Sequence, residues 1–64
     1  MISPLALIHP GAKIGENCTV EPFVYIEDNV VIGDNCIIMP HACILYGTRM
    51  GNNNKVFHGA VVGG

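Results

Sequence analysis

The sequence predicts an all-β fold, a parallel β-helix of about three and a half triangular coils, and two periodicities support this prediction. Residues 14–18, Ile-Gly-Glu-Asn-Cys, return as Ile-Gly-Asp-Asn-Cys at 32–36 and as Met-Gly-Asn-Asn-Asn at 50–54, so the chain copies itself every 18 residues. Such self-similarity is the sign of a stacked-repeat architecture. A shorter period of six runs through the whole chain, in which an aliphatic residue or Met recurs without interruption. These positions are Ile2, Ile8, Ile14, Val20, Ile26, Ile32, Ile38, Ile44, Met50, Val56 and Val62.

A helix cannot use this pattern, because one apolar residue in six makes no continuous stripe at 3.6 residues per turn. A chain that turns after every short strand can bury each of these residues. Alternate residues of a strand share a face, so the residue two positions before each aliphatic should also point inward. Small or compact side chains occupy nine of these ten positions, and Asn54 is an exception that the pattern does not explain. The ten are Ala6, Ala12, Cys18, Val24, Val30, Cys36, Ala42, Thr48, Asn54 and Ala60.

The turns between the expected strands form ladders of their own. Gly and Asn tolerate the left-handed backbone conformation that tight turns require, and they recur at two corners of the expected triangle. The third corner is less regular, and prolines precede it in three coils. The corner residues are Asn17, Asn35 and Asn53; Gly11, Asn29 and Gly47; and Leu5, Phe23, His41 and Gly59 after Pro4, Pro22, Pro40 and His58. These arguments do not fix the hand of the coil, and the general rule for parallel crossovers is right-handed.

Taken in order, the chain fills one triangle after another. The first coil begins at Met1, with Ile2 already in register, and the second ends at Ile37. The third runs from Ile38 to Lys55, and the chain from Val56 opens a fourth. No linker separates these segments, so residues 1–64 are expected to form one domain. Repeat arrays need capped ends, and the last residues lie in mid-coil with no polar cap. We therefore expect a partial β-helix domain that is truncated at its C-terminus.

Composition excludes several classes of function. The net charge is −2 and the three Lys and Arg residues are scattered, whereas nucleic-acid binding needs a clustered basic face. The sequence has no secretory signal and no apolar run long enough to span a membrane. Three cysteines without an export signal favour a reducing, cytoplasmic location. Cys18 and Cys36 are expected to be core residues one coil apart rather than a disulfide.

One wall of the expected coil is apolar on its outer side. Contiguous exposed apolar surface often marks a subunit contact, so we predict that Leu7, Tyr25, Cys43 and Leu45 help to pack a homotrimer. The alternative is that these side chains are incidental surface hydrophobes, which are common.

Three histidines are the residues most able to carry chemistry near neutral pH. His9 precedes Pro10 and is expected to be structural or solvated. His41 and His58 should lie one coil apart on the same edge, and they are our candidates for substrate binding. The alternative is a polar edge stacked by the repeat. No metal-ligand spacing, carboxylate pair, activated serine or phosphate loop is present, so we expect no metal, no cofactor and no catalytic residue within this chain.

The hexads resemble the bacterial hexapeptide-transferase repeat, whose members coil left-handed. Several segments also resemble the N-terminus of the acyl-[acyl-carrier-protein]–UDP-N-acetylglucosamine O-acyltransferases of lipid A synthesis, in order and without a gap. They are Ile-Ser-Pro at 2–4, Ile-His-Pro at 8–10, Ala-Lys-Ile-Gly at 12–15, Glu-Pro-Phe at 21–23, His-Ala at 41–42, Gly-Thr-Arg-Met-Gly at 47–51, Asn-Lys-Val at 54–56 and Ala-Val-Val-Gly at 60–63.

The resemblance implies a left-handed coil and a homotrimeric parent enzyme. Such enzymes transfer a hydroxyacyl chain from acyl carrier protein to UDP-N-acetylglucosamine, using a histidine as general base in a cleft between subunits. In the family pattern that histidine lies beyond residue 64, and none of the three histidines here occupies its position. The resemblance therefore implies that this chain is inactive by itself.

Three other functions remain open at this stage. The chain could belong to another hexapeptide transferase, such as the related N-acyltransferase, a sugar or serine acetyltransferase, or a nucleotidyltransferase tail. It could belong to a metal-dependent carbonic anhydrase built on the same coil, although the histidine spacing counts against this. It could also be a non-catalytic β-helix scaffold.

Overall fold

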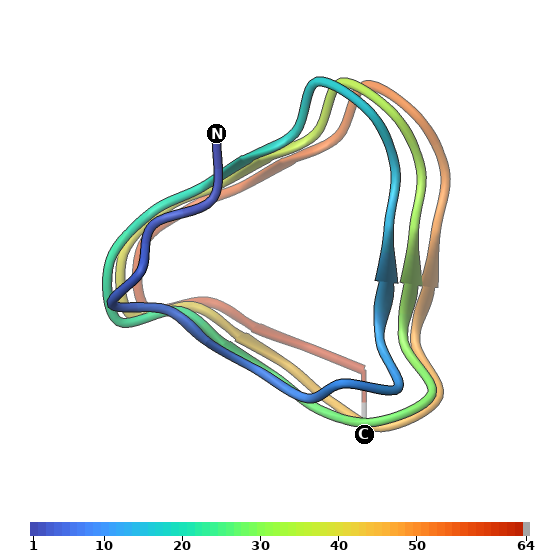
Figure 1. Cartoon of the computed structure of the whole chain (residues 1–64), viewed down its shortest axis with the longest axis horizontal. Helices are drawn as coiled ribbons and strands as arrows, with labels where there is room; N and C mark the ends of the chain where they lie inside the picture. Colours follow the sequence, from blue (N-terminus) through green and yellow to red (C-terminus); the bar gives the residue numbers. More distant parts are fainter. Residues whose placement is uncertain (64) are drawn as a thin grey trace.

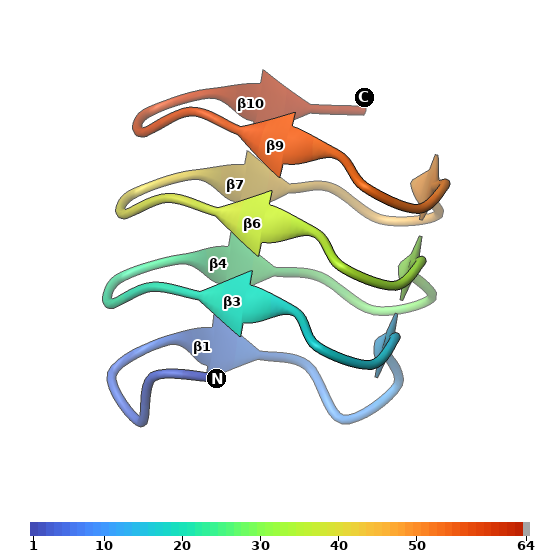
Figure 2. The same cartoon turned by 90° about the horizontal axis from the view of Figure 1, so that it is seen from above.

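The chain winds into a stack of triangular coils. The computed structural model describes residues 1–63, and Figure 1 looks down the axis of the coil while Figure 2 shows the coils stacked above one another. Ten two-residue strands lie along the three walls, and no helix occurs among the described residues. The strands are β1 (Leu7–Ile8), β2 (Lys13–Ile14), β3 (Thr19–Val20), β4 (Tyr25–Ile26), β5 (Val31–Ile32), β6 (Ile37–Ile38), β7 (Cys43–Ile44), β8 (Arg49–Met50), β9 (Lys55–Val56) and β10 (Val61–Val62).

Each wall is a parallel sheet whose strands are one coil apart. The sheets have the orders β1-β4-β7-β10, β2-β5-β8 and β3-β6-β9. Ile14 pairs with Ile32, and Ile32 pairs with Met50, so the 18-residue register predicted from the repeat is confirmed. A bridge between Ile2 and Val20 extends the third sheet to the start of the chain.

The coil is left-handed. In Figure 1 the blue N-terminal coil lies nearest the viewer, and the chain turns anticlockwise as it recedes toward the red C-terminal end. This agrees with the hand that the family resemblance implied. It departs from the right-handed rule for parallel crossovers.

The core is a narrow column of inward-pointing side chains along the axis. Its two middle coils are the best packed, because each has a coil above and below. The buried members are Cys18, Val20, Val24, Ile26, Val30, Ile32, Cys36, Ile38, Ala42, Ile44 and Val56. At the two ends the column opens to solvent: Ile2 is 48% exposed, and Asn54 is also exposed. The predicted inward positions are thus confirmed, while burial falls off at the ends.

Corner residues adopt the left-handed conformation at every predicted corner except two in the first coil. Asn17, Asn35 and Asn53 do so with φ of 58°, 59° and 62°, and Asn29 and Gly47 do so at the second corner. The third corner is more regular than its sequence suggested. Phe23 and His41 both have a φ of 66°, and Gly59 has a φ of 73°. The preceding proline sets the turn in the first two cases.

The first coil differs from the later ones at two corners: Leu5 and Gly11 lie in turns, but neither is left-handed. In later coils several corner amides donate to the coil below, as the Phe23 N–H does to the Leu5 carbonyl at 3.2 Å, whereas the Asn29 N–H donates to the Asp28 side chain of its own coil. Among the described residues, no coil lies on that side of the first one. The Leu5 N–H donates instead to Ser3 Oγ at 3.1 Å, and the Gly11 N–H donates to His9 Nδ1 at 3.1 Å. Local side-chain acceptors therefore close these two turns.

The inward cysteines are free and hydrogen-bonded to glycine carbonyls. The Cys18 thiol donates to the Gly33 carbonyl at 3.1 Å, and the Cys36 thiol donates to the Gly51 carbonyl at 3.2 Å. Asn54 follows in the same ladder, and its amide donates to the Gly51 carbonyl at 3.1 Å. This bond explains why a polar residue is accommodated at an otherwise small, apolar position.

Candidate functional site

The sheet β1-β4-β7-β10 presents an apolar outer surface, which we call the first wall. Its outward residues are Leu7, Tyr25, Cys43 and Val61, paired in register from coil to coil. Leu7 and Val61 are about two-thirds exposed and Tyr25 is 39% exposed, while Cys43 and the adjacent Leu45 are half-buried. The structure thus brings together the four residues predicted to pack a trimer, with Val61 as an addition.

A second apolar surface was missed by the sequence reasoning. It lies on the sheet β3-β6-β9, and we call it the second wall: Ile37, Met39 and Phe57 face outward there. Ile37 is 39% exposed and Phe57 is 60% exposed, and the Lys55 ammonium lies 5.4 Å from the centre of the Phe57 ring. The signal was available, because Ile37 and Phe57 directly flank inward-pointing aliphatic residues.

The candidate histidines belong to two different ladders. His41 lies at the third corner one coil above Phe23, and their rings stack with centroids 5.3 Å apart at an interplanar angle of 21°. Gly59 follows His41 in this ladder, while His58 is in register with Pro40, whose carbonyl accepts the Gly59 N–H at 3.2 Å. Both histidines are exposed. The partner that the structure gives His41 is therefore Phe23, and substrate binding by His41 and His58 stays a prediction.

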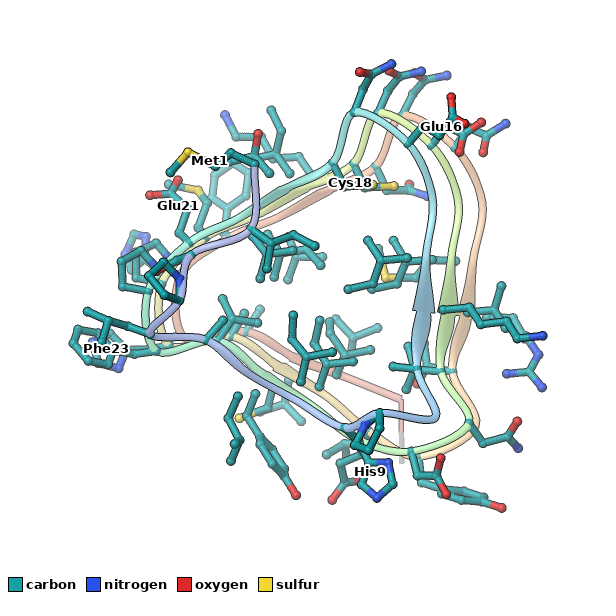
Figure 3. The ribbon with its side chains drawn as sticks, viewed as in Figure 1. Met1, His9, Glu16, Cys18, Glu21 and Phe23 are labelled. Atoms are coloured by element: carbon teal, nitrogen blue, oxygen red, sulfur yellow. The ribbon has the colours of Figure 1, made fainter. Side chains whose placement is uncertain are left out.

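His9 lies at the second corner of the coil, well separated from Phe23 (Figure 3). Its Nδ1 accepts the Gly11 N–H and lies 3.3 Å from Oδ1 of Asp28 in the second coil. Both side chains are about half exposed. The sequence reasoning assigned His9 a structural or solvated role, and it did not foresee the contact with Asp28.

The described residues form a solid prism rather than a cleft. No pocket is found among residues 1–63, and no three His, Cys, Asp or Glu side chains of these residues lie close enough to hold one metal ion. Figure 3 shows why: the interior is filled by the inward ladders, including Cys18, and the polar side chains project outward at the corners.

Comparison with known proteins identifies the family to which the chain belongs. The family model described as bacterial transferase hexapeptide (six repeats) matches residues 11–46, and the chain belongs to this family. Over 63 residues it is 43% identical to an acyl-[acyl-carrier-protein]–UDP-N-acetylglucosamine O-acyltransferase from Bartonella bacilliformis, a match that covers 98% of this chain and 23% of the relative. The resemblance of the sequence to the N-terminus of these O-acyltransferases is thereby confirmed.

A solved structure is also similar. The crystal structure of LpxA, a UDP-N-acetylglucosamine acyltransferase from Bacteroides fragilis, matches with a TM-score of 0.97 and 68% identity over 98% of this chain and 25% of that chain. This chain thus spans about a quarter of the length of the two relatives. A search of the described residues finds no helix capable of crossing a membrane.

Proposed function

We propose that the chain forms the N-terminal coils of a cytoplasmic acyltransferase that moves a 3-hydroxyacyl chain from acyl carrier protein to UDP-N-acetylglucosamine in lipid A synthesis. The observation that supports this is the likeness to the LpxA crystal structure, with 68% identity and a TM-score of 0.97 over 98% of the chain. In a coil with an 18-residue register, such identity without a shift preserves which residues face inward, outward and into each corner.

In this proposal the chain contributes coils and subunit contacts but not the reacting groups. The family pattern supports that division, because in it the general-base histidine lies beyond residue 64. We therefore expect no acyl transfer from the 64-residue chain alone.

A chimera tests the proposal. The 64 residues replace the matching segment of Bacteroides fragilis LpxA, and transfer from 3-hydroxyacyl carrier protein to UDP-N-acetylglucosamine is followed by mass spectrometry. We expect the chimera to be active and the isolated chain to be inactive. Transfer by the isolated chain, or a folded chimera without activity, would contradict the proposal.

We further propose that the first wall packs a homotrimer. A ring with threefold symmetry uses heterologous contacts, in which two different patches of each subunit meet. The structure offers two apolar surfaces for this purpose, around Tyr25 on the first wall and around Ile37 on the second. The remaining sheet, β2-β5-β8, shows Lys13, Val31 and Arg49 outward and is the candidate for a solvated wall.

Matched charge substitutions distinguish the walls. Tyr25, Ile37 and Val31 each occupy the outward position of a middle strand, and they are 39%, 39% and 36% exposed. In the chimera, we expect Tyr25→Glu and Ile37→Glu to dissociate the trimer, because a buried unpaired carboxylate is costly, and Val31→Glu to leave it intact. Analytical ultracentrifugation reads the outcome, and a trimer that survives Tyr25→Glu would rule out the first wall.

A further inference from the structure

One ring nitrogen of His9 has two neighbours that demand opposite protonation states. Nδ1 lies 3.1 Å from the Gly11 amide nitrogen and 3.3 Å from Asp28 Oδ1. An amide N–H needs an acceptor, so it pairs with a bare Nδ1. A carboxylate needs a donor, so it pairs with a protonated Nδ1. A single nitrogen cannot serve both partners at once, and its proton therefore decides which contact is made.

The carboxylate is held in place for this choice. Asp28 Oδ1 accepts the N–H of Asn29 at 2.8 Å, which fixes it at the second corner of the second coil. Gly11 lies directly beneath it, and a Cβ at Gly11 would overlap Asp28 Oδ1 and lie only 3.0 Å from Asp28 Cγ. The absence of a side chain at residue 11 therefore allows the Asp28 carboxylate to reach the imidazole.

Other charged groups leave this pair undisturbed. Asp28 is the one acidic side chain of the described residues within 4.0 Å of His9. The neighbouring Glu27 is turned toward the coil above, where its carboxylate accepts the Tyr46 N–H at 2.8 Å. Arg49 is engaged by the carbonyl and side-chain oxygens of Asn29. The state of His9 is thus coupled chiefly to Gly11 on its own coil and Asp28 on the next.

We propose that His9 is a proton-dependent clip between the first two coils. The neutral imidazole, protonated on Nε2, caps the Gly11 N–H and closes the turn of the first coil on itself. The imidazolium donates Nδ1–H to the Asp28 carboxylate, releases the Gly11 N–H to solvent and ties the first coil to the second. Imidazole side chains ordinarily change charge between about pH 5 and about pH 8. The clip does not depend on the proposed acyltransferase function.

Nuclear magnetic resonance of the chain between about pH 8 and about pH 5 tests the clip. At the upper end, imidazole nitrogen shifts should show a bare Nδ1 and a protonated Nε2. As the ring becomes doubly protonated, Gly11 amide exchange, corrected for the intrinsic rate, should lose about fivefold in protection, the factor that one hydrogen bond provides. The Asp28 carboxyl carbon shift should change over the same range as the ring.

His9→Gln is the matched variant, because its amide oxygen can accept the Gly11 N–H but carries no titrating proton. We expect Gly11 protection to become independent of pH in this variant, and the shared step in the Asp28 shift to disappear. A neutral His9 protonated on Nδ1, or unchanged Gly11 protection across the titration of the ring, would overturn the proposal. Both of these observations are made on the unmodified chain, so they stand even if the variant fails to fold.

Discussion

At the scale of single residues, two glycines allow one coil to lie against the next. A Cβ on Gly33 would lie 2.7 Å from the backbone carbonyl carbon and oxygen of Gly51, and one on Gly15 would lie 2.6 Å from those of Gly33. Backbone atoms cannot move aside without shifting the coil above. Gly51 is in the same ladder, but a Cβ there would find its nearest neighbour, Asn54 Nδ2, at 3.9 Å. Within residues 1–63, the backbone of the next coil therefore excludes a side chain at Gly15 and Gly33 but not at Gly51.

Gly33→Ala should destabilise the chain by about 1–3 kcal/mol, the usual cost of forcing an extra methyl group into a filled space. Gly51→Ala should change stability by less than about 0.5 kcal/mol, because the added methyl group would make only an ordinary contact with Asn54. Urea denaturation followed by circular dichroism measures both. If the two substitutions had equal effects, close approach of the next coil would not be the reason why glycine occupies this position.

The hydrogen bonds at the ends of the stack were the hardest feature to predict from the sequence. The hexad pattern predicted the inward ladders because every interior coil repeats the same environment. It could not predict that the Leu5 and Gly11 N–H groups would donate to the side chains of Ser3 and His9, since these two bonds do not recur in the later coils. Asn54 posed the same difficulty, because its hydrogen bond to a glycine carbonyl continues the cysteine ladder with a different chemical group.

At the scale of elements, no strand is stable by itself, because each has two residues and makes all its strand pairing with other coils. Short isolated strands have no stability in water. Burial along the column therefore provides the main driving force, and it differs with position in the sheet. Ile26 on β4 has strands on both sides and is fully buried, whereas Ile8 on the edge strand β1 is only half-buried.

Ile26→Ala should therefore cost about 3 kcal/mol, within the range for deleting a buried isoleucine side chain. Ile8→Ala removes the same atoms from a partly solvated site and should cost no more than about half as much. The measurement is the free energy of unfolding of each variant from urea titration. If the two substitutions cost the same, stability does not depend on a neighbour on each side of the strand.

At the scale of the whole molecule, the sequence predicted the triangular stack and its register, because the 18-residue repeat leaves few other ways to bury one residue in six. The handedness of the coil could not be predicted from the repeat. Crossover statistics favour the right-handed coil, and only the resemblance to a known family indicated the left-handed one seen in Figure 1. The role of the apolar walls could not be predicted from the hexad pattern, because the pattern constrains the inward positions and leaves the outward ones free.

A stack in which each coil touches only its neighbours should have a stability that grows nearly in proportion to the number of coils. Insertion of a second copy of residues 19–36 after residue 36 adds one interior coil without changing the register. At about 0.05–0.15 kcal/mol per residue, the longer chain should unfold with about 1–3 kcal/mol more free energy. The control carries one extra glycine between the copied Tyr25 and Ile26, which turns the rest of that strand to the opposite face. Urea titration should show the first insertion to be stabilising and the control destabilising. Equal midpoints for both would mean that the stack does not require the six-residue register that its sequence keeps throughout.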